Sequence, residues 1–129
     1  MQGLHLTADL RGCRCPLAHL TDATELLAFC ARSVQEAGLQ AVSQLSHRFP
    51  DTEAGPGGVT ATVLLAESHL CVHTWPEQAS VTLDVYVCNM GGDHSHRARS
   101  LLDTLLRHFD PDSTQQHTLH RGAVATPAG

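Results

Sequence analysis

The feature that constrains the fold most is a series of short β-prone segments separated by turn-forming residues. Residues 59–66 and 70–74 are rich in β-branched and apolar residues, while 81–87 and Leu4–Leu10 alternate between apolar and polar residues. Alternation with a period of two is typical of a strand that buries one face. The sequence also favours a strand over residues 41–48 and a short strand within 116–119.

Two other segments carry apolar residues at helical spacing. The first covers residues 21–37, with Thr21 or Asp22 as its N-cap and Gly38 at the position of a C-terminal glycine. The second covers residues 95–109. Strands that pair around two such helices indicate an antiparallel sheet covered on one face.

We therefore predict one domain over residues 1–129, an α+β two-layer sandwich with an antiparallel sheet and two helices on one face. The glycine- and proline-rich segment 50–58 is expected to be a loop. Residues 123–129 are expected to be a frayed tail.

Composition excludes several classes of function. The 129 residues carry 13 acidic and 8 basic side chains, a net charge of −5, which argues against nucleic acid as a partner. All basic residues are arginine, so chemistry on a lysine Schiff base, including pyridoxal phosphate catalysis, is excluded for this chain alone. Five cysteines, no signal peptide and no long apolar run predict a reduced, cytoplasmic protein without a membrane span.

Residues 64–77 hold an unusual density of reactive groups: a serine hydroxyl, two imidazoles, a thiol, two carboxylates and the only tryptophan. Along an extended segment Ser68 points to one side, while His69, Cys71 and His73 point to the other. A turn near Glu67–Ser68 would relax this separation. Taken singly, each of these residues is more often structural than functional, so the case depends on the whole set.

That set resembles the prokaryotic S-adenosylmethionine decarboxylase family, whose members are self-processing and pyruvoyl-dependent. The resemblance rests on Glu67-Ser68-His69, on His73-Thr74-Trp75-Pro76-Glu77 and on Cys88. The resemblance covers most of the chain and extends to Gly3-Leu4-His5-Leu6, Cys13, His47-Arg48-Phe49-Pro50 and the whole block from Gly58 to Cys88.

The resemblance implies a proenzyme that cuts itself between Glu67 and Ser68 by serinolysis, into a beta chain of residues 1–67 and an alpha chain of 68–129. Ser68 then becomes a covalent pyruvoyl group, the electron sink that forms a Schiff base with the substrate amine. Such a group explains how a chain without lysine can decarboxylate an amino acid. The activity implied is a carboxy-lyase that converts S-adenosylmethionine to the aminopropyl donor for spermidine, in polyamine biosynthesis.

Individual roles follow from the same resemblance. His73 is the proton acceptor for processing, and Thr60 assists it where relatives often have serine. Cys88 is the proton donor that returns a proton to the substrate after decarboxylation. A neutral imidazole and a protonated thiol suit these tasks near neutral pH.

The implied substrate-binding residues are Glu77, for the ribose hydroxyls, and Phe49 and Trp75, for adenine or the sulfonium. The resemblance also implies a homodimer with its active sites at the interface. The chain departs from many relatives at Gln78-Ala79 and at Asn89, which bears on the fit of the substrate.

Alternative interpretations stay open at this point. Related proteins on the same fold decarboxylate arginine. A His/Cys metal-binding module would use Cys13-x-Cys15 and Asp93–His96, but paired zinc-ligand clusters are missing, so we predict no metal and expect Asp93 or Ser95 to cap the second helix. A regulatory homologue would lack Ser68, His73 or Cys88, and a serine hydrolase built on Ser68, His73 and Glu77 would lack its nucleophile elbow.

Overall fold

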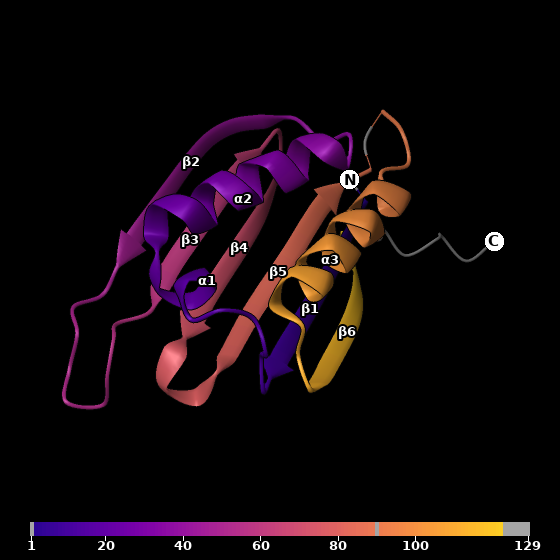
Figure 1. Ribbon diagram of the computed structural model, residues 1–129. Coiled ribbons are helices and arrows are strands. Elements are labelled where there is room, and N and C mark those ends of the chain that lie inside the picture. The colour runs from indigo at the N-terminus through magenta and orange to yellow at the C-terminus, as the bar shows by residue number, and fades with distance from the viewer. Residues whose placement is uncertain (1, 90, 123–129) are drawn as a thin grey trace.

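The β-prone segments form one six-stranded sheet in a computed structural model that describes residues 2–89 and 91–122. Every pair of neighbouring strands is antiparallel, in the order β2-β3-β4-β5-β1-β6. The strands are β1 (Gly3–Arg11), β2 (Ala41–Arg48), β3 (Val59–Leu65), β4 (Ser68–Trp75), β5 (Ser80–Cys88) and β6 (Ser113–Arg121). Consecutive strands β2 to β5 are adjacent, whereas β1, the first strand of the chain, lies between β5 and β6 (Figure 1).

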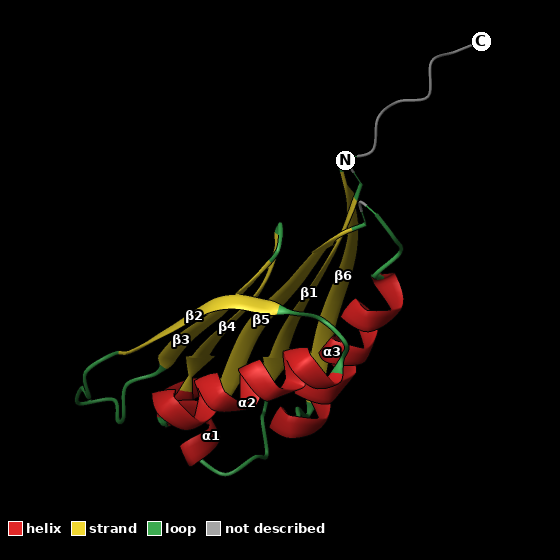
Figure 2. Ribbon diagram, turned by 90° about the horizontal axis from the view of Figure 1, so that it is seen from above, coloured by secondary structure: helices red, strands yellow, loops and turns green. Residues whose placement is uncertain are grey.

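The helices all lie on one face of this sheet, as Figure 2 shows. They are α1 (Ala18–Thr21), α2 (Ala23–Glu36) and α3 (Ser95–Phe109), and a short 3-10 turn, η1 (Pro76–Gln78), joins β4 to β5. Helix α2 packs over β2 and β3, while α3 packs over β1 and β5. The α+β two-layer sandwich is therefore confirmed, with a third, single-turn helix that the sequence pattern did not predict. The opposite face of the sheet, which we call the open face, carries no helix among the described residues.

The core lies between the sheet and the helices. Alternate strand residues point into it, such as Leu4 and Leu6 in β1 and Leu70 and Val72 in β4, all at most 2% exposed. Helix α3 contributes residues including Leu105, which is fully buried. Burial of such a side chain contributes about 1.5–3 kcal/mol, so one apolar face per strand fixes which residues face the helices.

Two helix starts refine the sequence interpretation. Asp22, one of the two predicted N-caps, caps α2 by accepting the N–H of Glu25 at 3.1 Å. The prediction for α3 was wrong, because His94 holds the N-cap position. Asp93 still accepts the Ser95 N–H at 2.9 Å, so its carboxylate closes a turn just before the helix.

Strand β6 is longer than the strand predicted at 116–119. It is an edge strand, and all nine of its residues are exposed. Without an apolar face, its sequence shows little alternation that would mark its ends. The predicted tail at 123–129 lies outside the described residues. None of the described helices is long and apolar enough to cross a bilayer.

Candidate active site

The hairpin between β3 and β4 brings the predicted cleavage junction to a strained turn. Leu65 pairs with Ser68, so Ala66 and Glu67 form a two-residue connection. Glu67 has a φ of +57°, in the left-handed region that favours glycine. A side chain in that region costs about 1–2 kcal/mol, so the residue before the predicted cut stores backbone strain.

Ser68 is held beside Cys88 at this end of β4. The Cys88 N–H donates to Ser68 Oγ at 2.9 Å. Both residues line a cavity of about 320 Å³, together with Glu67 and His94 and with the loop that joins α2 to β2. The structure thus brings together the predicted pyruvoyl precursor and the predicted proton donor.

His73 and Thr60 form a second centre, towards the other end of β4. They are direct partners in the β3–β4 ladder, and Thr60 Oγ1 lies 3.0 Å from His73 Nδ1. This bond fixes the imidazole through Nδ1, so Nε2 is the nitrogen that can act on another group.

The predicted substrate-binding residues gather around this second centre. Phe49, Trp75 and Glu77 line a cavity of about 420 Å³ with Thr60 and His73. The Trp75 ring lies 6.1 Å from that of His73, and Phe49 and Trp75 are 48% and 39% exposed. The loop before β3 closes the cavity, and a Cβ at Gly58 would collide with the carbonyl oxygen of Thr74. Two exposed aromatic rings beside a carboxylate suit a flat ligand with hydroxyl groups.

Within one chain the two centres are separate. Ser68 and His73 lie five residues apart on β4, which at the rise of a strand is roughly 16 Å. They also face opposite sides, since Leu70 and Val72 are buried beneath the helices while His69, Cys71 and His73 are half-buried on the open face. The turn at Glu67 precedes β4 and does not relax this separation.

The cleavage junction is also accessible from the open face. A cavity of about 530 Å³ there is lined by Glu67, Ser68, His69, Tyr86 and Arg121, among others. The junction can therefore be approached from the same side of the sheet that carries His73.

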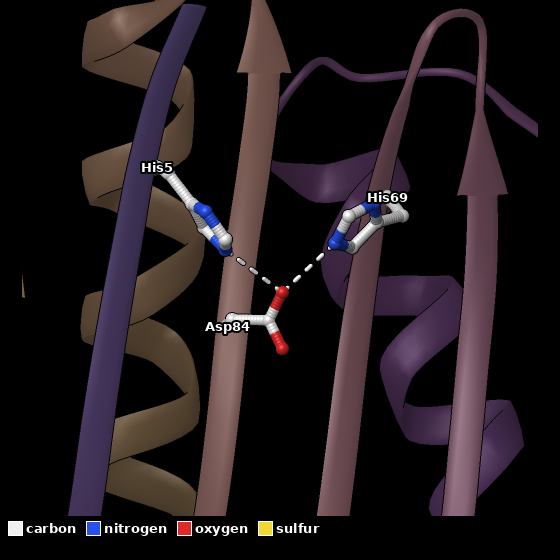
Figure 3. Close-up of side chains that lie close together, drawn as sticks. All are labelled: His5, His69 and Asp84. Atoms are coloured by element: carbon white, nitrogen blue, oxygen red, sulfur yellow. Dashed lines mark hydrogen bonds and ion pairs between the residues drawn. The ribbon is translucent and has the colours of Figure 1, made fainter. Parts of the chain in front are cut away.

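One cluster carried no predicted role. His5, His69 and Asp84 meet on the open face, near this cavity (Figure 3). Alternation alone places all three on one face, but only the pairing of β1, β4 and β5 brings them together, and register cannot be read from one sequence. The segments once considered for a metal, Cys13-x-Cys15 and Asp93–His96, take no part in this cluster.

Comparison with known proteins agrees with this architecture. The family model described as S-adenosylmethionine decarboxylase matches residues 4–122. The S-adenosylmethionine decarboxylase proenzyme of Aquifex aeolicus is 37% identical over 95% of this chain and 82% of its own length. The corresponding proenzyme of Persephonella marina is 35% identical over 95% of this chain and 84% of its own length.

A solved structure supports the same relationship. The crystal structure of the adenosylmethionine decarboxylase from Aquifex aeolicus superimposes with a TM-score of 0.81 and 30% identity, covering 98% of this chain and 96% of that one. Because the sequence match spans nearly all of the chain and the fold agrees over the same length, this protein belongs to the S-adenosylmethionine decarboxylase family.

Proposed function

We propose that this protein is a proenzyme that cuts itself between Glu67 and Ser68 and then decarboxylates S-adenosylmethionine. The two products of the cut are residues 1–67 and 68–129. One observation carries the proposal: Ser68 follows a left-handed Glu67 at a tight turn, and its Oγ is held by the Cys88 N–H beside a cavity that the Cys88 side chain also lines. The product would supply the aminopropyl donor for spermidine.

The residues at this junction fit a pyruvoyl group. A serine at the first position of β4 becomes a chain end after cleavage, and a residue with a left-handed backbone conformation, Glu67, precedes it. A cavity lies next to that end, with a thiol among its lining residues. When formed, the keto group condenses with the substrate amine and accepts the electron pair that departing carbon dioxide leaves behind.

Processing begins at Ser68 Oγ, which attacks the carbonyl carbon of Glu67 and converts the peptide bond to an ester. A base then removes the α-proton of residue 68, the Cβ–Oγ bond breaks, and the Glu67 carboxylate departs with Oγ. The dehydroalanine that remains takes up water and loses ammonia. The Cys88 N–H is placed to stabilise negative charge on Oγ, the oxygen that leaves.

We assign the base to His73, supported by the Thr60 hydroxyl, and we propose that both come from a partner protomer. His73 is too far from Ser68 in its own chain, but it faces the open side from which the junction is accessible. A homodimer that pairs two open faces would place the His73 of one protomer at the junction of the other. The exposed Leu64 and Trp75 on this face, at 46% and 39%, support such a contact.

The cavity around His73 is the proposed substrate pocket. Phe49 and Trp75 would hold the adenine or face the positively charged sulfonium, which favours an aromatic face. Glu77 would accept hydrogen bonds from the ribose hydroxyls. Cys88 would protonate the substrate carbon after decarboxylation.

The free thiols at all five cysteines accord with a cytoplasmic location.

Ser68→Ala tests the processing step. The variant lacks the attacking oxygen, so its intact mass should correspond to one uncut chain without activity, while the parent and a Ser46→Ala control on β2 should give two fragments. Two fragments from Ser68→Ala would refute the assignment.

Complementation tests the shared site. His73→Ala and Cys88→Ala are each expected to be inactive or nearly so, but a mixed dimer contains one site with Ser68 and Cys88 from one protomer and His73 from the other. Co-expression should therefore restore cleavage of the His73→Ala chain and part of the activity. An uncut His73→Ala chain in the isolated mixed dimer would refute the contribution from the partner.

A further inference from the structure

The cluster on the open face is a hydrogen-bonded set centred on one carboxylate oxygen. Asp84 Oδ2 lies 3.0 Å from His5 Nε2 and 2.8 Å from His69 Nε2 (Figure 3). The carboxylate comes from β5, and the two imidazoles come from the strands on either side, β1 and β4. Both imidazole rings also lie against Tyr86, with centroids 5.6 and 5.7 Å from its ring.

Arg121 fixes the tautomer of His5. Its Nη1 lies 3.2 Å from His5 Nδ1, and a guanidinium only donates. His5 Nδ1 is therefore the acceptor, and Nε2 carries the hydrogen that is donated to Asp84. A metal ion would need the lone pair of that same Nε2. The contact with Arg121 thus favours a hydrogen-bonded carboxylate over a metal site.

The cluster is next to the place where the proposed reaction occurs. His69 is bonded directly to residue 68, and once Ser68 has lost its hydroxyl the His69 side chain would be the first after the cut with a hydrogen bond to a neighbouring strand. Cleavage would open the hairpin turn and leave this end of β4 held by its ladders to β3 and β5, and a free strand end frays unless it is tied down. The bond from His69 to Asp84 is such a tie, and His5 holds the carboxylate from the other side.

We propose that Asp84 is a positioning residue: through His69 it keeps residue 68 of the cleaved chain in place beside Cys88. This inference rests on the proposed function. His5 belongs to the fragment 1–67, whereas His69 and Asp84 belong to 68–129, so the cluster also joins the two fragments.

Positioning matters because the electron pair left by carbon dioxide has two places to take a proton. Protonation of the substrate carbon, followed by hydrolysis, releases the amine product and restores the keto group. Protonation of the residue 68 carbon, followed by hydrolysis, leaves the substrate nitrogen on residue 68 as alanine and releases an aldehyde. A displaced strand end would favour the second outcome, which inactivates the chain permanently.

Two variants test this role. Asp84→Asn removes the charge but keeps the shape, and His69→Phe keeps a ring against Tyr86 but removes the hydrogen bond. Asp9→Asn is the matched control, because it removes a carboxylate from exposed Asp9 in β1, outside the cluster. Intact mass of the fragment 68–129 after a fixed number of turnovers gives the fraction that ends in alanine. Hydrogen exchange of residues 69–71 gives a second readout that does not depend on turnover.

We expect both variants to cleave, to lose on the order of tenfold in kcat with KM within about twofold, and to accumulate alanine several times faster than the parent. Residues 69–71 should exchange on the order of tenfold faster than in the cleaved parent, and Asp9→Asn should match the parent. If Asp84→Asn does not fold, His69→Phe alone decides.

Variants that match the parent in alanine content and in hydrogen exchange would overturn this inference and leave the proposed function standing. An uncut parent would instead overturn the proposed function, and this inference with it.

Discussion

The two ends of β4 are built by different means. At the amino end, main-chain groups fix the geometry: a left-handed Glu67 and the N–H of Cys88. Towards the carboxyl end, side chains do so, through the Thr60–His73 bond and the aromatic cavity. A cut in the protein's own chain happens once and needs a fixed local geometry at the junction, whereas a diffusing substrate needs a pocket with its own recognition groups. We therefore expect the amino end to hold the junction and the carboxyl end to hold the substrate, with His73 as the group at the carboxyl end that would also act on the cut.

The largest expected effect comes from His73→Ala, which removes the group at the carboxyl end that is assigned to the cut at the amino end. His73→Ala should leave the chain uncut or halted at the ester, because loss of a general base costs about 10²–10⁴ in rate. Intact mass over several hours measures the cleavage, with His96→Ala on α3 as a control that cleaves normally. Cleavage of His73→Ala at the parental rate would mean that the base lies elsewhere.

Cys88→Ala separates the role of the Cys88 main-chain N–H from the role of its thiol. The N–H that donates to Ser68 Oγ remains, so the variant should still cleave, while turnover falls by about 10²–10⁴ and alanine appears at residue 68. Single-turnover assays and fragment masses report the two effects. Cys30→Ala is the control: burial raises the pKa of this core thiol to about 12, so its loss should alter stability and not protonation. Parental turnover of Cys88→Ala would make Cys88 a structural thiol.

Trp75→Ala tests whether the aromatic cavity at the carboxyl end acts on the substrate and not on the cut. The variant should cleave at the parental rate, and its KM should rise by roughly tenfold because an aromatic face for the sulfonium is lost. Leu17→Ala, an exposed apolar residue just before α1, provides the control and should leave KM unchanged. A slower cut with an unchanged KM would assign Trp75 to processing instead of substrate binding.

The smallest effect concerns the strain at the turn. Glu67→Gly should stabilise an uncut Ser68→Ala background by about 1 kcal/mol, and in an otherwise parental chain it should slow the cut by up to roughly fivefold. Ala79→Gly is a matched control, since Ala79 also has a positive φ, of +48°. It should give similar stabilisation, measured by urea unfolding, without altering cleavage. Equal cleavage rates in the two glycine variants would show that strain at Glu67 does not assist processing.

Much of the site could be predicted because alternation is a local property. The opposite facing of Ser68 and His73 follows from their spacing on a strand, and the structure confirms that a turn does not reunite them. The partnership of Thr60 with His73, in contrast, depends on the register of β3 against β4. The Asp84 cluster depends on two further ladders, so a single sequence could not reveal it.

The fold shows the same division. The apolar stripes of α2 and α3 and the buried faces of the central strands predicted a two-layer sandwich. Helix α1 is a single turn of four residues, too short for periodicity to reveal, and β6 has no apolar face to mark its limits. Elements that bury an apolar face could be recognised from their own residues. The bounds of α1 and β6, in contrast, depend on the contacts that these elements make in the folded chain.

The position of β1 has a consequence for how the protein refolds. A cut at Glu67–Ser68 leaves β1, β2 and β3 in one fragment and β4, β5 and β6 in the other, yet β1 lies between β5 and β6, and β3 pairs with β4. Separation of the fragments would require three ladders to open, so the cleaved protein should unfold as a single unit. Once unfolded, however, it must reassemble from two molecules, so its recovery depends on concentration, whereas the uncut precursor refolds alone. Cleavage would therefore make the native state easier to reach from the intact chain than from separated fragments, so that after the cut it would be retained mainly by slow unfolding.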